Sequence, residues 1–356
     1  MSHQDIYRIG IVGASSLAGK ELAESLTGAQ LGSSDIVLLD DEAAAGQLEP
    51  LGEEVALIQQ LDAGSFDRMD FVFFAGDAAG TRNYWKAALL AGVSIVDLTG
   101  ALEGEPAVLV RAPWVSELLS RNVPDKAALS DFPPDLKTHA VVSAHPAAVM
   151  LALVMARLQG SLAVRSLAVT LLEPASQHGR APMDELHQQT VSLLSFQNLP
   201  REQYDAQVAF NVLPALGEAA KVRLAASEGR VRAHYALLSF GRLPALVLQV
   251  AQAPVFHGYV ASLMVEFSAP ATLEQVEAAL QGDHIDVALG DSDPPSNLSA
   301  SGQGDILARV RLEPPGSVAS NRCWLWLAAD NLKLGAMNAI ACAQELRRLR
   351  PLGKVQ

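Results

Sequence analysis

The sequence predicts an α/β fold of two domains, and three observations support this expectation. The 356 residues exceed the ~250–300 at which a single hydrophobic core stops growing. Half of the residues are hydrophobic and only 18% are charged, which leaves ample apolar material for large cores. Apolar strand-like runs alternate with helical stretches in the N-terminal third, a pattern typical of a parallel sheet with helices on both faces.

The chain opens with a strand, a glycine-containing turn and a helix. Residues 7–12 (YRIGIV) predict a buried strand, GASSLAG follows, and the helical KELAESLTGA comes next. In a dinucleotide-binding fingerprint the first glycine makes the tight turn, the last lets helix and strand approach, and the helix N-terminus faces a pyrophosphate. Ser16 replaces the middle glycine, so an ordinary turn without a ligand is the alternative. The candidate cofactor-binding residues of this turn are Gly13, Ala14, Ser15, Ser16, Leu17, Ala18 and Gly19.

A second predicted strand, residues 35–39 (DIVLL), ends in the acids Asp40, Asp41 and Glu42. A carboxylate about twenty residues past the fingerprint can bind a ribose 2′-hydroxyl, and three acids together repel a 2′-phosphate. Asp40 therefore joins the candidate cofactor site, and NAD is favoured over NADP. The alternative is a solvated acidic loop.

Two more strands extend the predicted parallel sheet. Residues 70–75 (DFVFFA) and 93–97 (VSIVD) are apolar and flank a helical stretch. Gly76 and Gly80 lie at the carboxyl end of the first of them, where sheets of this kind bind ligands. Gly76 is the last candidate cofactor-binding residue.

Residues 140–158 (AVVSAHPAAVMLALVMARL) predict a short strand, a sharp turn and a long apolar helix. Pro146 suits the first helical turn, where its missing N–H costs nothing. A strand-to-helix turn of this kind directs backbone N–H groups and the positive end of a helix dipole at one place, where an enzyme would position a nucleophile. This chain has Ala147 and Ala148 there, so the predicted active centre has no reactive atom.

The rest of the chain predicts a second domain of strands and helices. Strands are expected at residues 161–172, 234–240, 246–251 and 260–267 and before residue 330; helices at 183–195, 271–282 and 334–348; and polar loops at 196–207 and 290–305.

Charge and cysteine content exclude several classes of partner. The net charge of −13 argues against nucleic acid and anionic membranes, which attract clustered Lys and Arg. No apolar run reaches the ~18–20 residues of a membrane span, and the N-terminus does not resemble a signal peptide. Cys323 and Cys342 lie in apolar stretches and are expected to be buried in a reducing cytoplasm. No Cys or His spacing indicates a metal site.

Four segments in order resemble the aspartate-β-semialdehyde dehydrogenase family. They are IGIVGASSLAGKEL (9–22), LLEPASQHGRAPMDEL (171–186), AFNVLPALGE (209–218) and DNLKLGAMNAIACAQEL (330–346). The resemblance implies a Rossmann-type dinucleotide-binding domain, residues 1–140, closed by the C-terminal helix at 330–356. It also implies an α+β substrate and dimerisation domain at 141–329, and hence a homodimer. The reaction that it implies is hydride transfer with phosphorylation through a thioester.

The family's reactive residues are replaced in this chain. The resemblance places the nucleophilic cysteine at Ala148, the substrate-orienting glutamine at Glu173, the carboxylate-binding arginine at Gln252, the base histidine at Tyr259 and a phosphate-binding arginine near Glu103. The residues that receive a 2′-phosphate fall near Asp41 and Ala43, in a loop that aligns loosely. Alanine has no nucleophilic atom, a tyrosine with pKa ~10 is a poor base, and glutamine cannot make a charged bidentate contact. No catalytic residue is therefore expected at these positions.

Several polar residues near these positions have two interpretations. His257 is two residues from Tyr259, and we expect a packing or surface role for it. His145 and His178 lie in the turns that would form the pocket. Glu218 and Lys221 faintly resemble the family's substrate-pocket E-x-x-K, although a helix salt bridge explains that spacing more commonly.

The sequence therefore predicts a degenerate family member that is inactive in the family reaction and resembles the Usg-type paralogues, which lack the catalytic cysteine. It would keep the fold, the homodimer and NAD or NADP binding, or act through a small-molecule ligand or partner protein. One alternative is an NAD(P)-linked oxidoreductase of another small substrate, with Tyr259, His257 or Glu173 as acid or base. Another is an active aspartate-semialdehyde dehydrogenase with a divergent nucleophile.

Overall fold

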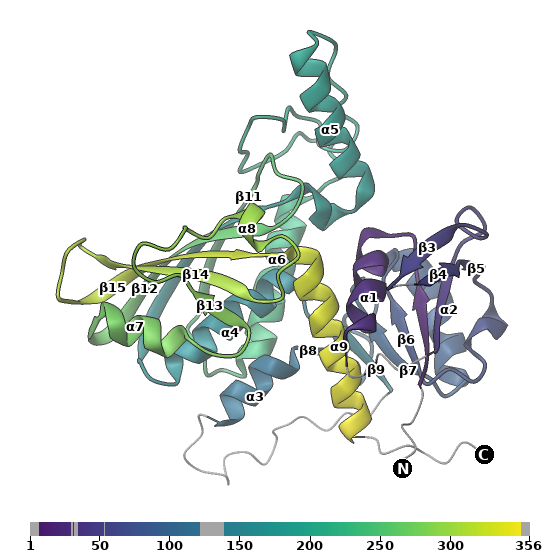
Figure 1. The fold of residues 1–356 in the computed structure, drawn as a ribbon, viewed down its shortest axis with the longest axis horizontal. Coiled ribbons are helices and arrows are strands. Elements are labelled where there is room, and N and C mark those ends of the chain that lie inside the picture. The colour runs from purple at the N-terminus through teal and green to yellow at the C-terminus, as the bar shows by residue number, and fades with distance from the viewer. Residues whose placement is uncertain (1–6, 30, 32–34, 53, 122–138, 350–356) are drawn as a thin grey trace. The chain divides into compact units, whose positions relative to one another are not determined.

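The computed structural model describes residues 7–29, 31, 35–52, 54–121 and 139–349. The chain divides into two compact units, one of residues 1–144 and 335–356 and the other of residues 145–334. The predicted α/β class is confirmed, since one unit holds a parallel sheet and the other a mixed sheet, each with helices (Figure 1).

The first unit is built on a seven-stranded parallel sheet in the order β5-β2-β1-β6-β7-β9-β8. Its strands are β1 (Arg8–Val12), β2 (Asp35–Asp40), β5 (Gln59–Gln60), β6 (Phe71–Phe74), β7 (Ser94–Asp97), β8 (Leu109–Arg111) and β9 (Ala140–Ser143). Its helices are α1 (Leu17–Thr27), α2 (Ala78–Leu90), α3 (Pro113–Arg121) and most of α9 (Asn331–Leu349), and β3 (Leu48–Leu51) pairs with β4 (Glu54–Leu57) in a separate hairpin.

Both faces of this sheet are buried, which explains why its strands are apolar without alternation. Along β6, Phe71 and Phe73 enter one core cluster, and Val72 and Phe74 enter the other. Successive side chains on a strand point to opposite faces, so each apolar run supplies both cores.

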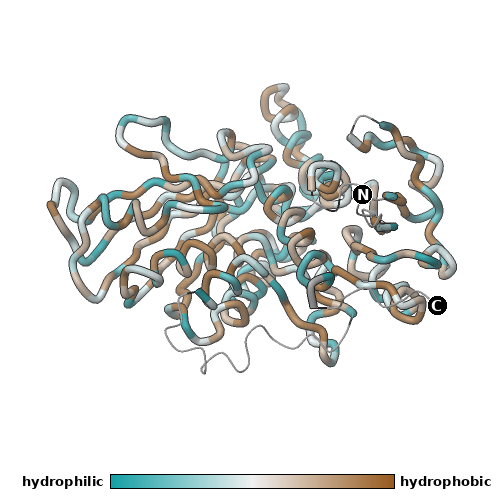
Figure 2. The backbone as a smooth tube through the Cα atoms, turned by 60° about the horizontal axis from the view of Figure 1, so that its bottom comes forward, coloured by the Kyte–Doolittle hydropathy of each residue, from teal (hydrophilic) through white to brown (hydrophobic). Residues whose placement is uncertain are grey.

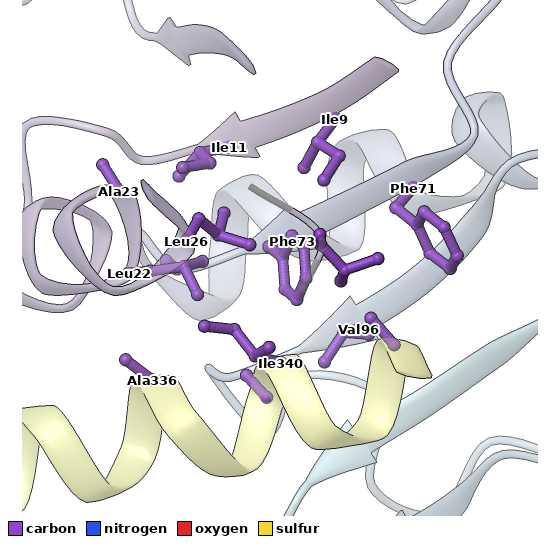
Figure 3. Packing of buried hydrophobic residues seen from close by; sticks show 14 of the residues in the cluster. Ile9, Ile11, Leu22, Ala23, Leu26, Phe71, Phe73, Val96, Ala336 and Ile340 are labelled. Carbon is purple, nitrogen blue, oxygen red and sulfur yellow. The ribbon is translucent and has the colours of Figure 1, made fainter. Parts of the chain in front are cut away.

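Helix α9 covers one face of the sheet together with α1. Ala336 and Ile340 of α9 and Leu22 of α1 belong to the same buried cluster as Ile9 and Phe73 (Figure 3). The last helix of the described chain therefore completes a core whose other buried members come from residues 7–141.

A buried ion pair also fixes α9 in this unit. The Arg111 guanidinium, at the end of β8, donates to the Glu345 carboxylate from Nε at 2.8 Å and from Nη2 at 2.5 Å. Arg111 is only 1% exposed. On the same helix the Asn338 amide donates to the Arg111 carbonyl and to Ser143 Oγ of β9.

The second unit holds a six-stranded mixed sheet in the order β11-β10-β12-β15-β14-β13. Its strands are β10 (Val164–Glu173), β11 (Leu246–Gln252), β12 (Tyr259–Thr272), β13 (Ile285–Val287), β14 (Ile306–Glu313) and β15 (Ala319–Ala329). Its helices are α4 (Pro146–Gln159), α5 (Arg180–Leu194), α6 (Leu224–Ser239), α7 (Leu273–Leu280) and the short α8 (Asn297–Ala300).

Helix α4 is the buried centre of this unit. Every residue from Ala147 to Ala156 is fully buried, and the helix contacts β10, α6 and α7. Its nearly uniform apolar sequence follows from contacts on all sides. Figure 2 colours the backbone by hydropathy, with hydrophobic residues in brown.

One predicted strand is wrong: residues 234–240 form the end of α6 and the residue after it. Buried residues of this helix at 231, 234, 235 and 238 follow the helical period, and the stretch 234–240 contains no β-branched residue to favour a strand. The predicted polar loop at 290–305 also contains α8, which Ser296 caps by accepting the Ser299 N–H. Within the described residues, no helix has the length and apolarity needed to cross a membrane.

Candidate functional site

The turn between β1 and α1 requires glycine at two positions. Gly13 has φ +81°, and a Cβ there would lie 2.2 Å from the Cα of Gly76, which follows β6. A Cβ on Gly19 would lie 2.2 Å from the Gly13 carbonyl oxygen. The predicted tight turn and close helix–strand approach are therefore present, although the cofactor role of these residues stays a prediction.

Ser16, at the imperfect position of the fingerprint, stabilises this turn. Its Oγ accepts the Gly19 N–H at 2.9 Å, which caps α1, and donates to the Ala75 carbonyl at 2.8 Å. The helix provides no partner for the N–H groups of Leu17 and Ala18, which belong to its first turn. A phosphate group would find these donors at the positive end of the α1 dipole.

Asp40 lies beside the same turn. Its Oδ2 accepts the Ser15 N–H at 2.8 Å, and its Oδ1 accepts the Asp41 N–H at 2.9 Å. The two glycine contacts, the helix N-terminus and this carboxylate are the features that a dinucleotide with an adjacent ribose needs, so the residues fit such a cofactor.

In the second unit, His145 forms the start of α4. Its Nδ1 accepts the Ala147 N–H at 3.3 Å, and its own N–H donates to His234 Nδ1 at 2.9 Å. Ala148, where the resemblance predicts the family's nucleophile, is fully buried in the first turn of the helix.

Both thiols of the chain are buried in cores, as predicted. Burial raises the pKa of the Cys323 thiol to about 12, and it raises the pKa of Cys342 further. Cys323 lies in β15, and Cys342 lies on α9 in the other unit. Neither is a thiolate at neutral pH, so neither offers a nucleophile.

Glu173 and Gln252 end the neighbouring strands β10 and β11 and face each other in register. The buried Glu173 carboxylate accepts from Ser227 Oγ at 2.5 Å and lies 2.8 Å from His178 Nε2. The Gln252 amide donates to the Glu173 and Ala253 carbonyls, and its Oε1 is buried without a hydrogen-bond partner among the described residues. The hydrogen bonds of the Gln252 side chain therefore go to backbone carbonyls.

Tyr259, at the start of β12, heads a chain of hydrogen bonds. Its hydroxyl donates to Gln177 Oε1 at 2.5 Å, and Gln177 Nε2 lies 3.1 Å from His145 Nε2. Burial and the Glu173 carboxylate raise the pKa of the Tyr259 hydroxyl well above its ordinary value. Burial, followed by the charges of Arg230, His234 and His178, lowers the pKa of His145 well below its ordinary value. At neutral pH the tyrosine is thus a protonated donor and the imidazole is uncharged.

A cavity of about 440 Å³ opens beside this chain of hydrogen bonds. It is lined by His145, Gln177, His178, Ala181, Pro182, Gln203, Lys221, Val222, Arg223, Ala226, Ser227 and Arg230. Both histidines predicted to lie in pocket-forming turns line it. Ala148, Glu173, Gln252 and Tyr259 do not, although Glu173 and Tyr259 contact residues that do.

The structure corrects the helix salt bridge suggested for Glu218 and Lys221. These residues lie in turns before α6 rather than in a helix, and Lys221 lines the cavity instead. His257 is half-buried, and Glu103 is exposed in a turn of the other unit.

Gln177, Ser227 and Arg230 were missed by sequence reasoning. Gln177 carried a signal, because it lies next to His178 in the segment 171–186 that resembles the family. Ser227 and Arg230 gave none, since they lie on α6, part of which was mistaken for a strand. Among the residues that the structure describes, no group of three or more His, Cys, Asp or Glu side chains is placed to hold a metal ion.

Comparisons with known proteins cover both units. The family model described as "Semialdehyde dehydrogenase, NAD binding domain" matches residues 8–123. The family model described as "Semialdehyde dehydrogenase, dimerisation domain" matches residues 155–333. A USG-1 protein homolog of Pseudomonas aeruginosa is 30% identical over 95% of this chain and 97% of its own length. The aspartate-semialdehyde dehydrogenase of Rickettsia bellii is 24% identical over 96% and 97%.

Solved structures are similar over nearly the whole chain. That of a probable aspartate-semialdehyde dehydrogenase from Pseudomonas aeruginosa has a TM-score of 0.81 at 28% identity, covering 98% of this chain and 100% of its own. That of aspartate semialdehyde dehydrogenase II from Vibrio cholerae has a TM-score of 0.80 at 21% identity, with the same coverage.

Proposed function

This chain belongs to the semialdehyde dehydrogenase family, and on that premise we propose that it is a member that lacks the family's thioester chemistry. The four-segment resemblance is confirmed at the level of the family, with USG-1 homologs among the relatives. The proposal adds that the chain keeps its nucleotide-binding domain for a role other than oxidising aspartate semialdehyde.

The observation that carries this proposal is the absence of a thiol at the start of α4. Ala148 is fully buried, and both cysteines of the chain lie in hydrophobic cores with raised pKa values. A thioester needs a thiolate in contact with the substrate. Loss of a covalent nucleophile can lower kcat by ~10⁶.

Tyr259 and Gln252, at the positions predicted for the base and the substrate-binding arginine, make structural hydrogen bonds in this chain. Tyr259 keeps its proton and donates a hydrogen bond to Gln177, so it cannot act as the base. Gln252 donates to two backbone carbonyls, and an amide gives a carboxylate no charged contact. These hydrogen bonds support the proposal that both side chains have a structural role and no catalytic one.

We propose that the nucleotide-binding domain prefers NAD to NADP. Leu17 and Ala18 would hold the pyrophosphate and Asp40 the ribose, and a bound nicotinamide would supply hydride transfer. A 2′-phosphate would lie close to the Asp40 carboxylate and be repelled by it. Calorimetric titration of both nucleotides tests the preference, and tighter binding of NADP would overturn it.

The assay that tests the main proposal follows NAD(P)H absorbance with aspartate semialdehyde and phosphate. The wild-type protein must be purified from a host that lacks its own enzyme. We expect turnover far below ordinary enzyme rates. A kcat of ~1 s⁻¹ or more would show the proposal to be wrong.

The hydrogen-bond chain Tyr259–Gln177–His145 supports a second candidate, an NAD(P)-linked oxidoreductase of another small substrate. Hydride transfer to a carbonyl or imine needs a proton donor and no thiol. The buried hydroxyl is linked through the Gln177 amide to His145, on the cavity wall. A screen of aldehydes, ketones and imines with NADH supports this candidate only if turnover appears and Tyr259→Phe removes it.

A further inference from the structure

We propose that the outer face of the β3–β4 hairpin binds a short segment of a partner protein in which apolar side chains stand beside Lys or Arg. This face consists of Leu48 and Pro50 of β3 and of Val55 and Leu57 of β4. It goes beyond the proposed function, because it needs neither a bound nucleotide nor any turnover. It also lies outside residues 155–333, which match the dimerisation domain.

The four side chains share one face of the hairpin. In the antiparallel register Leu48 lies opposite Leu57, and Pro50 lies opposite Val55. Side chains of directly opposite residues point to the same face, and so do those of residues two apart on one strand. The four residues therefore form one continuous apolar surface.

This surface is exposed to solvent. Leu48 is 66% exposed, Val55 65% and Leu57 53%, and Pro50 is exposed as well. A hairpin with one face in water ordinarily has polar side chains on that face, whereas here the solvent-facing positions are apolar. Contiguous exposed apolar side chains are typical of surfaces that another molecule covers.

The inner face fixes the hairpin to the rest of its unit. Leu51 and Ala56 pack against the buried cluster that contains Leu22 of α1, and β3 contacts this helix (Figure 1). Glu49, also on the inner face, accepts from Lys20 Nζ of α1 at 2.6 Å. The outer face is therefore held in place before a partner binds, which lowers the entropy lost on binding.

The charge around the hairpin favours a cationic partner. Residues 35–67 contain nine Asp or Glu and no Lys or Arg. Among these acids, Glu54 directly precedes Val55 and is exposed, and Asp41 and Glu42 are exposed in the segment that leads to the hairpin. Partners with complementary charge associate faster and in the correct register. A segment that carries Lys or Arg beside its apolar residues has that complementarity.

A second copy of the chain is a poor match for this face. A twofold contact joins the same surface of both copies, so it would bring two acidic stretches together. Four side chains also provide far less area than the ~800 Å² per partner of a standard interface. The face instead suits a single strand or a few turns of helix from another protein.

Selection from a phage-displayed library of short random peptides tests the proposal, with the full chain as the target. Peptides that bind the double variant Leu48→Gln, Leu57→Gln are removed before selection on the wild type. We expect the selected sequences to combine apolar residues with Lys or Arg. No enrichment, or enrichment of peptides without Lys and Arg, overturns the proposal.

Fluorescence anisotropy of a labelled selected peptide then measures its affinity. Leu57→Gln should weaken the binding roughly five- to thirty-fold, because part of the apolar area that the peptide covers is lost. Glu54→Gln and added salt should each weaken the binding less. Leu90→Gln is the matched control, since it replaces an 89%-exposed leucine of α2 in the same unit, and it should bind like the wild type. If Leu57→Gln does not fold, as judged by circular dichroism, Val55→Thr carries the same test.

Two further results would contradict the proposal. Equal affinities of Leu57→Gln and Leu90→Gln would place the peptide elsewhere on the protein. A smaller mass of the double variant than of the wild type in light scattering would mean that a second copy of the chain covers this face.

Discussion

At the scale of single residues, Tyr259 stands where the resemblance predicts a base histidine, and it makes a structural contact. A histidine there could take a proton at pH 7, whereas the buried tyrosine keeps its proton and donates a hydrogen bond to Gln177. Gln177 in turn approaches His145, so three side chains that lie far apart in the sequence share one network.

Removing the Tyr259 hydroxyl should therefore destabilise the protein. We expect Tyr259→Phe to lower the free energy of unfolding by about 1–3 kcal/mol, because it leaves Gln177 Oε1 without its donor. Urea denaturation measures this change. Tyr204→Phe is the control: this tyrosine is equally buried, and its hydroxyl has no hydrogen-bond partner among the described residues. Equal losses in both variants would contradict the role given to the hydrogen bond.

Restoring the nucleophile alone should restore almost no activity. In Ala148→Cys the thiol would have no base beside it and no arginine to hold the substrate, and groups that act as a unit fail together. We expect no turnover of aspartate semialdehyde above the wild-type background in the absorbance assay. A gain of a thousandfold or more in this variant would mean that the remaining site is still competent.

Burial of a neutral His145 makes stability depend on pH. Its folded-state pKa lies below its unfolded value of ~6.5, so the unfolded state binds the proton more readily and stability falls as pH drops below ~6.5. The slope is up to ~1.4 kcal/mol per pH unit for one proton. Denaturation at pH 7.5 and 5.5 should show a smaller loss in His145→Gln than in the wild type. The exposed His187→Gln should keep the wild-type loss, and a matching reduction there would refute the assignment.

At the scale of elements, α9 depends on one buried ion pair as well as on apolar contacts. Arg111 and Glu345 form a bidentate pair in a region where neither is more than 9% exposed. Such a pair contributes little net stability compared with apolar residues, but removing one partner leaves a buried charge uncompensated.

Glu345→Gln should therefore lower the free energy of unfolding by about 3–5 kcal/mol. Glu117→Gln breaks the exposed Glu117–Arg121 pair of α3 and should cost under ~0.5 kcal/mol. Both are measured by urea denaturation. A loss below ~1 kcal/mol in Glu345→Gln would show that water or a rearranged side chain compensates for Arg111.

The sequence predicted the parallel sheet well because both of its faces are buried, so its strands are uninterrupted apolar runs such as 71–74. The prediction was wrong at 234–240, where aromatic and aliphatic residues without polar alternation are compatible with a strand or a helix. The contacts of this segment's helix with α4 and β11 favour the helical conformation. The site was predicted in part. His145 and His178 follow from the turns that hold them, whereas Arg230 reaches the cavity through tertiary packing that no local pattern encodes.

At the scale of the whole molecule, the second unit presents apolar side chains to solvent. Five of them follow or end α5: Val191, Leu194, Phe196, Phe210 and Val212. Phe196 is 98% exposed. Large exposed apolar side chains in one region are typical of surfaces that another protein covers. The match to a dimerisation domain at 155–333 makes a second copy of the chain the expected partner.

Light scattering at micromolar concentration should therefore return twice the mass of the chain, because obligate dimers bury ~2,000 Å² or more of largely apolar surface. Phe196→Asp should shift the equilibrium toward the monomer, and Leu90→Asp, which replaces an 89%-exposed leucine of the other unit, should not. A wild-type monomer would contradict the dimer.

Helix α9 has a consequence for how the chain is made. Its first residue, Asn331, accepts the Gly258 N–H within the second unit, whereas Ala336 and Ile340 complete the core of the first. A ribosome delivers residues 7–121 early, but the face of the sheet that α9 covers stays open until about residue 349 has emerged. The later unit can therefore close while the earlier one is incomplete. An exposed parallel sheet is prone to aggregate, so the nascent chain should be a client of chaperones throughout most of its synthesis.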